Sequence, residues 1–193
     1  MERFEIAGRA LELCVGDITH QTTQAIANAA NSGLLGGGGV DGAIHRAAGP
    51  RLLEACRALK RELASGRLPT GCAALTPGFD LAAKSVVHCV GPVYESDPGR
   101  APSLLAGCYR EALRLCVEHA IDSIAFPSIS TGAYGYPVEK AAPVALETVA
   151  AHLRSNEDPR TVRFVLFDER TFATYLAAAR RLLGAPVSSN SAG

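Results

Sequence analysis

The sequence predicts an α/β fold of three layers, in which helices cover both faces of a mixed central sheet. Short apolar segments alternate with longer segments of helical spacing along most of the chain, and this alternation is typical of strands joined by helices. The chain opens with two strand-like segments separated by Gly8-Arg9, a pattern that indicates a hairpin and therefore some antiparallel pairing. An apolar fraction of 48% and a charged fraction of 20% are ordinary for a globular domain with a buried core.

Each expected element follows from a local pattern. Short apolar or alternating runs predict strands at residues 4–7, 10–15, 25–28, 72–76, 85–90, 123–126 and 162–167. Apolar residues at helical spacing predict helices at residues 40–48, 50–64, 103–119, 137–153 and 171–183. Gly49 is expected to stop the first helix and Pro50 to begin the second, whereas Pro143 is expected to kink or restart the fourth.

The composition indicates one domain and argues against several function classes. The 193 residues suffice for one domain with a proper core, which we place at residues 1–184, followed by a short flexible tail at residues 185–193. Lys and Arg together number 19, as do Asp and Glu, so a surface that neutralises duplex DNA is not expected. No apolar run approaches the roughly 20 residues that span a bilayer, and the N-terminus lacks the apolar segment of a signal peptide. We therefore expect a cytoplasmic protein without a membrane partner. Separately, we expect a monomer.

The cysteine and histidine patterns do not indicate a metal centre. The six cysteines form no C-x-x-C pair, and most lie in apolar surroundings, which is typical of reduced thiols buried in a cytosolic protein. The five histidines are scattered, without H-E-x-x-H or another paired spacing. We expect neither a metal nor a cofactor, and a zinc site or a catalytic cysteine is the alternative.

A glycine-rich loop dominates the sequence: Asn28-Ala-Ala-Asn31-Ser-Gly-Leu-Leu-Gly36-Gly37-Gly38-Gly39-Val40-Asp41. It follows a short apolar strand and leads into a helix, so backbone N–H groups and a helix N-terminus are expected where they can bind phosphate. The loop matches neither G-x-x-x-x-G-K-[ST] nor G-x-G-x-x-G, and it contains no Lys or Arg. An anion held here would be bound by backbone groups; the alternative is a flexible turn.

A second loop has the same character, with the sequence Ser128-Ile-Ser130-Thr131-Gly132-Ala133-Tyr134-Gly135-Tyr136. It also follows a buried strand and precedes a helix, so the two loops are expected to hold the two sides of a diphosphate. The hydroxyls of Ser130 and Thr131 are suitable donors, and Tyr134 is placed to lie over a sugar. The alternative for Tyr134, and more so for Tyr136, is a packing role.

Asp17 directly follows a predicted strand and has two interpretations. Its carboxylate can accept a hydrogen bond from an adenine amine, with the Ile18 backbone serving the edge of the ring. Alternatively, Asp17 or Thr19 caps a short helix that runs through Gln24.

Asp41 and His45 are four residues apart and therefore share one face of the helix that follows the first loop. Both side chains can then reach a ligand held by that loop. The alternatives are that Asp41 complements the helix N-terminus and that His45 is a satisfied interior histidine.

Taken together, these motifs resemble the macrodomains, and among them the MacroD-type class. The resemblance lies in Gly16-Asp17-Ile18-Thr19, in Asn28-Ala-Ala-Asn31, in the run from Gly36 to Gly49, and in Ser130-Thr131-Gly132-Ala133-Tyr134-Gly135. His88-Cys-Val-Gly91-Pro92-Val and Cys108-Tyr109-Arg are similar to further segments of the family, so the resemblance extends from about Phe4 to Leu183. Ala27 and Tyr134 stand where related sequences often have valine and phenylalanine, and Tyr134 leaves the fine substrate preference open.

The resemblance implies a mixed sheet between helices and a cleft for ADP-ribose. It also implies hydrolysis of ADP-ribose from acidic side chains and deacetylation of O-acetyl-ADP-ribose. Asp41 and Asn31 are the expected catalytic residues, and the expected substrate contacts are Asp17, Ile18, Asn28, Gly37, Gly38, Gly39, Val40, His45, Ser130, Thr131, Gly132, Ala133 and Tyr134. The expected partners are ADP-ribose, ADP-ribosylated proteins and ADP-ribosylated nucleic-acid ends. The alternatives are a non-catalytic ADP-ribose binding module and an ADP-ribose 1″-phosphate phosphatase.

Overall fold

The computed structural model describes residues 1–187, which contain one mixed sheet of seven strands. The strands are β1 (Glu2–Ile6), β2 (Arg9–Val15), β3 (Ala25–Ala29), β4 (Ala73–Pro77), β5 (Ser85–Cys89), β6 (Ser123–Phe126) and β7 (Thr161–Leu166). Their order across the sheet is β1-β2-β7-β6-β3-β5-β4. The inner strands run parallel, and the edge strands β1 and β4 each pair antiparallel with a neighbour. The mixed sheet predicted from the opening hairpin is confirmed.

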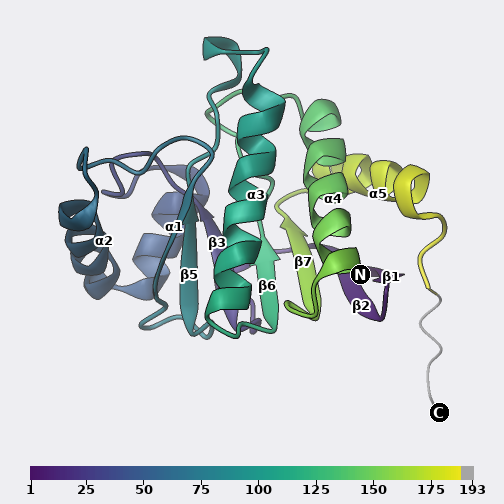
Figure 1. Cartoon of the computed structure of the whole chain (residues 1–193), viewed down its shortest axis with the longest axis horizontal. Helices are drawn as coiled ribbons and strands as arrows, with labels where there is room; N and C mark the ends of the chain where they lie inside the picture. The colour runs from purple at the N-terminus through teal and green to yellow at the C-terminus, as the bar shows by residue number, and fades with distance from the viewer. Residues whose placement is uncertain (188–193) are drawn as a thin grey trace.

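Within the described residues, five α-helices cover the two faces of this sheet: α1 (Gly39–Ala48), α2 (Pro50–Glu62), α3 (Ala101–Glu118), α4 (Val138–Ser155) and α5 (Glu169–Leu183). Helices α1 and α2 pack on one face, and α3, α4 and α5 pack on the other (Figure 1). Two single 3-10 turns, η1 (Ile18–His20) and η2 (Tyr94–Ser96), lie in loops. The three layers predicted from the sequence are therefore present.

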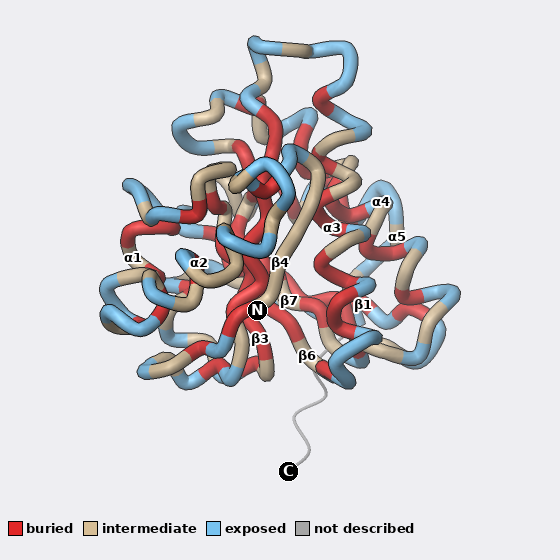
Figure 2. Tube along the Cα trace, turned by 60° about the vertical axis from the view of Figure 1, so that its left-hand side comes forward, coloured by how far each residue is buried: buried red, intermediate tan, exposed pale blue. Residues whose placement is uncertain are grey.

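Each face of the sheet has its own apolar core, and successive strand residues alternate between the two. On β3, Ala25 and Ala27 face the layer of α3, α4 and α5, whereas Ile26 faces α1 and α2. On β7, Phe164 and Val165 divide in the same way. Figure 2 shows the consequence, since the strands are largely buried and the connections are exposed. Burial on both faces explains why these strands appear in the sequence as continuous apolar runs.

The predicted starts of α3 and α5 are both two residues late, and α3 begins at Ala101 instead of Ser103. Helix α5 begins at Glu169, before the predicted Thr171, because the Asp168 side chain accepts from the Thr171 N–H at 2.7 Å and so caps the helix. Helix α4 continues through Pro143, so the restart expected there does not occur. The hydrogen bond that Pro143 removes would have reached the carbonyl of Glu139, an exposed residue in the first turn, where water can replace the lost donor.

The short helix expected to run through Gln24 is only the turn η1, which ends at His20. Gln21 has extended backbone angles, and its side chain Nε2 donates back to the Asp17 carbonyl at 3.1 Å. Asp17 is the N-cap of this turn, so its predicted capping role is confirmed.

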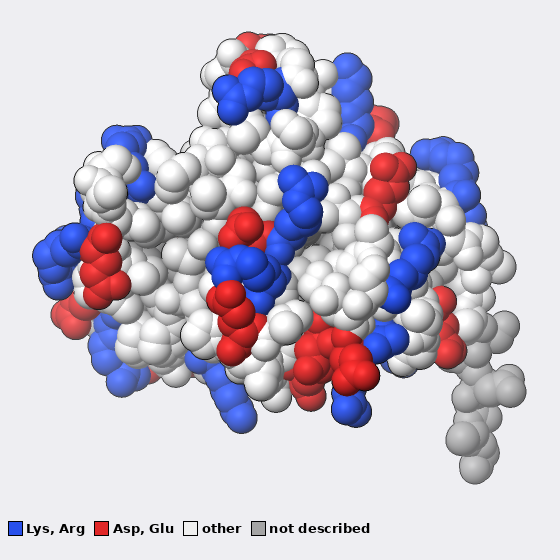
Figure 3. Space-filling model, viewed as in Figure 1, with Lys and Arg blue, Asp and Glu red and all other residues white. Residues whose placement is uncertain are grey.

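The surface carries both signs of charge, and the described part of the chain ends near β1. Figure 3 shows basic and acidic side chains interspersed on the face in view. No helix in the described residues is both long and apolar enough to cross a membrane. The Val187 N–H donates to the Arg3 carbonyl at 2.8 Å, which places residue 187 beside β1. The rest of the expected tail, residues 188–193, lies outside the described residues.

Candidate active site

The carboxyl ends of the parallel strands bring both glycine-rich loops to one edge of the sheet (Figure 1). Strand β3 lies between β5 and β6, with Ala29 opposite Cys89 and Ile26 opposite Ala125. The first loop therefore leaves β3 beside the point where the second loop leaves β6. Neighbouring strands here lead to connections on opposite faces of the sheet, and α/β proteins bind ligands at such a point.

The first loop ends in the N-terminus of α1. Gly38 is the N-cap, and Gly39, with a φ of 57°, is the first helical residue, one residue earlier than predicted. The Gly42 N–H donates to the Gly38 carbonyl at 3.3 Å, so the earlier N–H groups of Gly39, Val40 and Asp41 have no acceptor within the helix. A Cβ at Gly38 or Gly39 would meet no atom within 4 Å, so this end of the helix faces open space. The free N–H groups and the helix dipole suit a phosphate.

Asp41 is buried in the first turn of α1, with 5% of its surface exposed. Its Oδ1 accepts from Asn28 Nδ2 at 2.6 Å and lies 3.4 Å from Nε2 of His45, one turn along the helix. Its Oδ2 lies 3.1 Å from the position that a Cβ of Gly37 would occupy. The His45 ring in turn lies 3.7 Å from the position of a Cβ on Gly36. The protein thus fixes one carboxylate oxygen of Asp41 and leaves the other beside the loop.

Asn31 holds the first loop in shape. Its Nδ2 donates to the Gly36 carbonyl at 2.9 Å, and its Oδ1 accepts from the Gly33 N–H at 3.0 Å. The same Nδ2 lies 3.6 Å from the Cβ position of Gly37, which Asp41 Oδ2 also approaches. The structure therefore brings the two predicted catalytic side chains to the same glycine.

The second loop is braced from within. The Tyr136 N–H donates to the Ser130 carbonyl at 3.0 Å, and the Gly135 N–H donates to the Gly132 carbonyl at 2.9 Å. A Cβ at Gly132 would meet no atom within 4 Å. At the tip of the loop, the N–H groups of Thr131, Gly132, Ala133 and Tyr134 find no backbone acceptor among the described residues. These donors resemble the free N–H groups at the start of α1 and suit the second side of a diphosphate.

The two hydroxyls predicted to bind the ligand, those of Ser130 and Thr131, differ in their surroundings. Thr131 Oγ1 donates to the Ser128 carbonyl at 3.0 Å, so its proton braces the loop. Ser130 is buried in the left-handed region, with a φ of 67°, and its Oγ has no hydrogen-bond partner among the described residues. Gly91 makes this conformation possible, because a Cβ there would lie 2.1 Å from Ser130 Oγ. In the sequence Gly91 is only part of a segment similar to the family, and nothing there predicts this contact.

Asp17 and Ile18 follow the carboxyl end of β2. Asp17 Oδ1 accepts from the N–H and the hydroxyl of Thr19, at 2.8 and 2.7 Å, and these bonds lower the pKa of Asp17. No hydrogen bond from the described residues reaches Oδ2, so one oxygen caps η1 while the other is available to a ligand. The Ile18 side chain is buried in the core beneath α1, which fixes the position of this turn.

Phe167 is a candidate that the sequence analysis missed. It directly follows β7, whose Leu166 carbonyl accepts from the Gly16 N–H at 3.0 Å, so Phe167 lies near the turn that contains Asp17. Its 88% exposure is the highest among the large apolar side chains of the described residues. An exposed aromatic ring near a carboxylate that can accept from a base suits stacking on that base. In the sequence it is one more apolar residue at the end of a strand.

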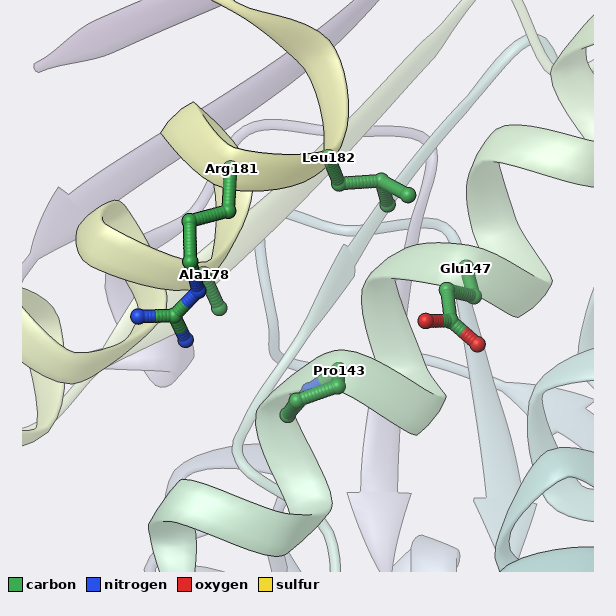
Figure 4. A pocket seen from close by; sticks show the side chains of 5 residues that line it. All are labelled: Pro143, Glu147, Ala178, Arg181 and Leu182. Carbon is green, nitrogen blue, oxygen red and sulfur yellow. The ribbon is translucent and has the colours of Figure 1, made fainter.

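No other feature of the described residues forms a second candidate active site. A shallow hollow between α4 and α5 is lined by side chains of these two helices and by none from either glycine-rich loop: Pro143, Glu147, Ala178, Arg181 and Leu182 (Figure 4). No group of three or more His, Cys, Asp or Glu side chains in the described residues is arranged to hold a metal ion. All six cysteines are free thiols, and burial raises the pKa of four buried ones: Cys56, Cys89, Cys108 and Cys116.

Comparisons with known proteins show which family the chain resembles. Residues 27–145, from the strand before the first loop to α4, match the Macro domain family. An O-acetyl-ADP-ribose deacetylase of Cronobacter turicensis is 48% identical over 179 residues, which cover 93% of this chain and 98% of the relative. A macro domain-containing protein of Chlorobaculum tepidum is 52% identical over 84% of this chain and 91% of its own length.

Solved structures agree in fold over most of the chain. The macrodomain of Oceanobacillus iheyensis with ADP is 49% identical and has a TM-score of 0.91, covering 93% of this chain and 95% of the other. The macrodomain of Trypanosoma brucei in complex with ADP-ribose is 41% identical, with a TM-score of 0.76 over 86% of this chain and 67% of the other.

Proposed function

The chain belongs to the Macro domain family, and from that premise we propose that it hydrolyses esters of ADP-ribose. One substrate is O-acetyl-ADP-ribose, which water converts to ADP-ribose and acetate. The other is ADP-ribose attached to an Asp or Glu side chain of a protein, which water converts to ADP-ribose and the free carboxylic acid. The observation that carries the proposal is Asp41, a buried carboxylate with one oxygen fixed by Asn28 and the other beside the anion-binding loop.

The arrangement of the loops supports ADP-ribose as the group recognised. The start of α1 and the tip of the second loop supply free backbone N–H groups for the two phosphates. Asp17 and Phe167, near the ends of β2 and β7, suit the adenine. Asn31 and Asp41 would then meet the distal ribose, which carries the ester. The relative named as an O-acetyl-ADP-ribose deacetylase and the macrodomains solved with ADP or ADP-ribose support the same assignment.

The chemistry requires little beyond position and charge. In the ester that joins C1″ of the distal ribose to an acidic side chain, the carboxylate is a good leaving group. In O-acetyl-ADP-ribose, water attacks the acetyl carbonyl and the ribose oxygen leaves with a proton. In both cases the site must hold the ester, place a water molecule and offset the developing charge. Asp41 would orient this water and accept its proton, and a phosphate of the substrate, held close by both loops, would assist. His45 lies beside the fixed oxygen of Asp41 and limits the movement of that side chain.

Two rival functions make different demands on the site. A binding module needs the loops and the adenine end but has no use for a buried carboxylate at the reacting ribose. A phosphatase acting on ADP-ribose 1″-phosphate would release inorganic phosphate. Asp41 and Asn31 beside one glycine favour the ester hydrolase over both.

The test is a comparison of three substrates with the purified protein: O-acetyl-ADP-ribose, a protein mono-ADP-ribosylated on glutamate, and ADP-ribose 1″-phosphate. We expect release of acetate and of ADP-ribose, and no release of phosphate, with or without EDTA. Tight ADP-ribose binding without turnover of any ester would refute the proposal in favour of a binding module. Loss of turnover in EDTA that one added metal restores would refute its metal-free form.

Three points remain predictions from the sequence. They are the monomeric state, the cytoplasmic location, and the use of ADP-ribosylated nucleic-acid ends as further substrates.

A further inference from the structure

A row of buried polar side chains crosses the sheet face that packs against α1 and α2. Thr76 on β4, His88 on β5 and Asn28 on β3 have exposures of 3%, 0% and 0%. Asn28 lies directly opposite His88 in the parallel pairing of β3 with β5. The neighbouring positions on the same face, Ile26 and Val86, belong to the apolar core. The row is therefore an interruption of an otherwise apolar surface.

The side chains of this row form one chain of hydrogen bonds that ends at Asp41. Thr76 Oγ1 lies 2.9 Å from His88 Nε2, and His88 Nδ1 lies 3.2 Å from Asn28 Nδ2. The same Asn28 nitrogen donates to Asp41 Oδ1 at 2.6 Å. Cys56 on α2 adds a weaker contact, with its Sγ 3.7 Å from His88 Nε2. A strand at the edge of the sheet is thus connected to the candidate catalytic carboxylate.

The donor and acceptor at each step follow from the charge on Asp41. A carboxylate only accepts, so the Asn28 amide must present its nitrogen to Asp41. The second N–H of that nitrogen meets His88 Nδ1, which must then be an unprotonated acceptor. Burial lowers the pKa of His88 to about 3, with His45 adding a smaller effect, so the ring is neutral at pH 7. Its single proton is therefore on Nε2, where Thr76 Oγ1 accepts it.

The other tautomer of His88 would break this chain. A proton on Nδ1 would face an N–H of Asn28, and the amide would have to turn its oxygen toward the Asp41 carboxylate to avoid the clash. Two acceptors would then meet at the position of the 2.6 Å bond. The Thr76 hydroxyl can pair with Nε2 in either tautomer, as donor or as acceptor. The Asp41 carboxylate, acting through Asn28, is therefore what requires the Nε2–H form.

Stability alone does not account for the row. Burying polar groups costs free energy that their hydrogen bonds at best offset, and apolar side chains of similar size would continue the surrounding core. Asn28 Oδ1 remains buried without a partner among the described residues, which adds to the cost. The row costs free energy to bury and ends at Asp41, so we attribute it to the way in which it positions the Asp41 carboxylate.

We propose that His88 is a positioning residue for ester hydrolysis: in its Nε2–H form, with Thr76 accepting that proton, its Nδ1 orients Asn28 so that the amide fixes Asp41. This inference rests on the proposed function, because it acts through Asp41. It gives a functional role to the buried side chains of His88 and of Thr76 on the edge strand β4, neither of which would contact the substrate.

The experiment compares substitutions that keep or remove one hydrogen bond of the row. Thr76→Val removes the acceptor for His88 with little change in shape, and Thr76→Ser keeps it. His88→Leu removes the acceptor for Asn28, and His88→Asn restores a carbonyl oxygen near the position of Nδ1. Thr148→Val is the matched control, because the Thr148 hydroxyl donates to the Val144 carbonyl within α4, on the other face of the sheet.

For Thr76→Val and His88→Leu we expect kcat on O-acetyl-ADP-ribose to fall about tenfold or more, the scale seen for residues that support a catalytic group. The dissociation constant of ADP-ribose, measured by calorimetry, should stay close to the wild-type value. Thr76→Ser and His88→Asn should recover most of kcat, and Thr148→Val should not change it. Nitrogen NMR of wild-type protein with labelled histidine should show His88 protonated on Nε2 and not on Nδ1.

Three outcomes would overturn the inference. One is equal kcat for Thr76→Val and Thr76→Ser; another is a proton on His88 Nδ1. The third is a parallel loss of kcat, ADP-ribose affinity and thermal stability, which indicates a structural role only. A wild-type protein without turnover would refute the proposed function itself, and the inference with it, whatever the NMR result.

Discussion

Asp41→Asn is the substitution that tests the candidate site most directly. Asparagine has the size of aspartate and keeps an oxygen that can accept from Asn28, whose Nδ2 now lies 2.6 Å from Asp41 Oδ1. It loses the negative charge at the start of α1 and replaces Oδ2, near Gly37, with an amide that cannot take a proton. The substitution therefore removes the proton acceptor and leaves the packing in place.

The expected losses in stability and in rate are well separated. Replacing a charged hydrogen bond with a neutral one costs about 1 kcal/mol. Losing the favourable charge at the helix N-terminus costs roughly 0.5 kcal/mol. A domain of ordinary stability, about 5–15 kcal/mol, stays almost fully folded after such a loss. Removing a general base slows the reaction roughly 100-fold or more, which corresponds to a barrier raised by about 2.7 kcal/mol.

The assay measures kcat on O-acetyl-ADP-ribose and on a glutamate-linked ADP-ribosyl protein, with thermal unfolding of the same samples. We expect folded Asp41→Asn protein with kcat reduced at least about 100-fold on both substrates. Asp122→Asn is the matched control, since Asp122 is exposed and lies just before β6, at the opposite end of that strand from the second loop. A rate for Asp41→Asn near the wild-type value would mean that Asp41 only stabilises the helix, and the assignment of the general base would be wrong.

Four further predictions concern binding and stability. Asp17→Asn should weaken ADP-ribose binding by about 1.5–3 kcal/mol, the worth of a charged hydrogen bond, and the inosine analogue should lose a similar amount with wild-type protein; equal binding of both nucleotides by wild type would leave Asp17 only its capping role. Gly38→Val and Gly132→Glu should abolish binding in calorimetry while circular dichroism stays native, because a Cβ at either position meets no atom within 4 Å; unfolding would mean that these glycines are structural. Phe167→Ala should weaken ADP-ribose binding by about 1–3 kcal/mol, the worth of one stacked base, without lowering the melting temperature, since the ring is 88% exposed; unchanged affinity would remove it from the site. The pKa of His88 is lowered from 6.5 to about 3 in the folded protein, so the unfolded state is protonated first as the pH falls and is then favoured. The contribution of His88 to the free energy of unfolding should be complete above about pH 6.5 and should fall by up to roughly 4–5 kcal/mol toward pH 3. The urea midpoint should therefore decline less with falling pH in His88→Asn than in the wild type.

The layers of the fold were predictable because they depend on local periodicity. Continuous apolar runs such as Ile124 to Phe126 mark strands buried on both faces, and longer runs of helical spacing mark the helices between them. The order of the strands was not predictable from these patterns. The placement of β3 between β5 and β6 depends on pairing between segments about 60 and 100 residues apart, which no local signal records.

The same division applies to the site. Residues within the loops were found because glycine runs, capping positions and i, i+4 spacing are local patterns that the sequence shows directly. Asp41 and His45, for example, share a helical face as predicted. Contacts that depend on strand register were missed, as with Gly91 against Ser130 and with the His88 bond to Asn28. The inward bond of Thr131 was also missed, because a sequence does not reveal which way a hydroxyl points.

The charge on Asp41 also distinguishes a hydrolase from a binding module. Two unit charges about 6 Å apart repel by roughly 3 kcal/mol at an effective dielectric constant of 20, so a carboxylate beside a bound diphosphate weakens binding. A module selected only for ADP-ribose affinity would gain from a neutral residue at this position. A hydrolase accepts weaker binding of the ground state because the carboxylate acts in the transition state. Asp41→Asn should therefore bind ADP-ribose at least as tightly as the wild type while losing turnover, and calorimetry that shows much weaker binding would assign Asp41 to recognition instead.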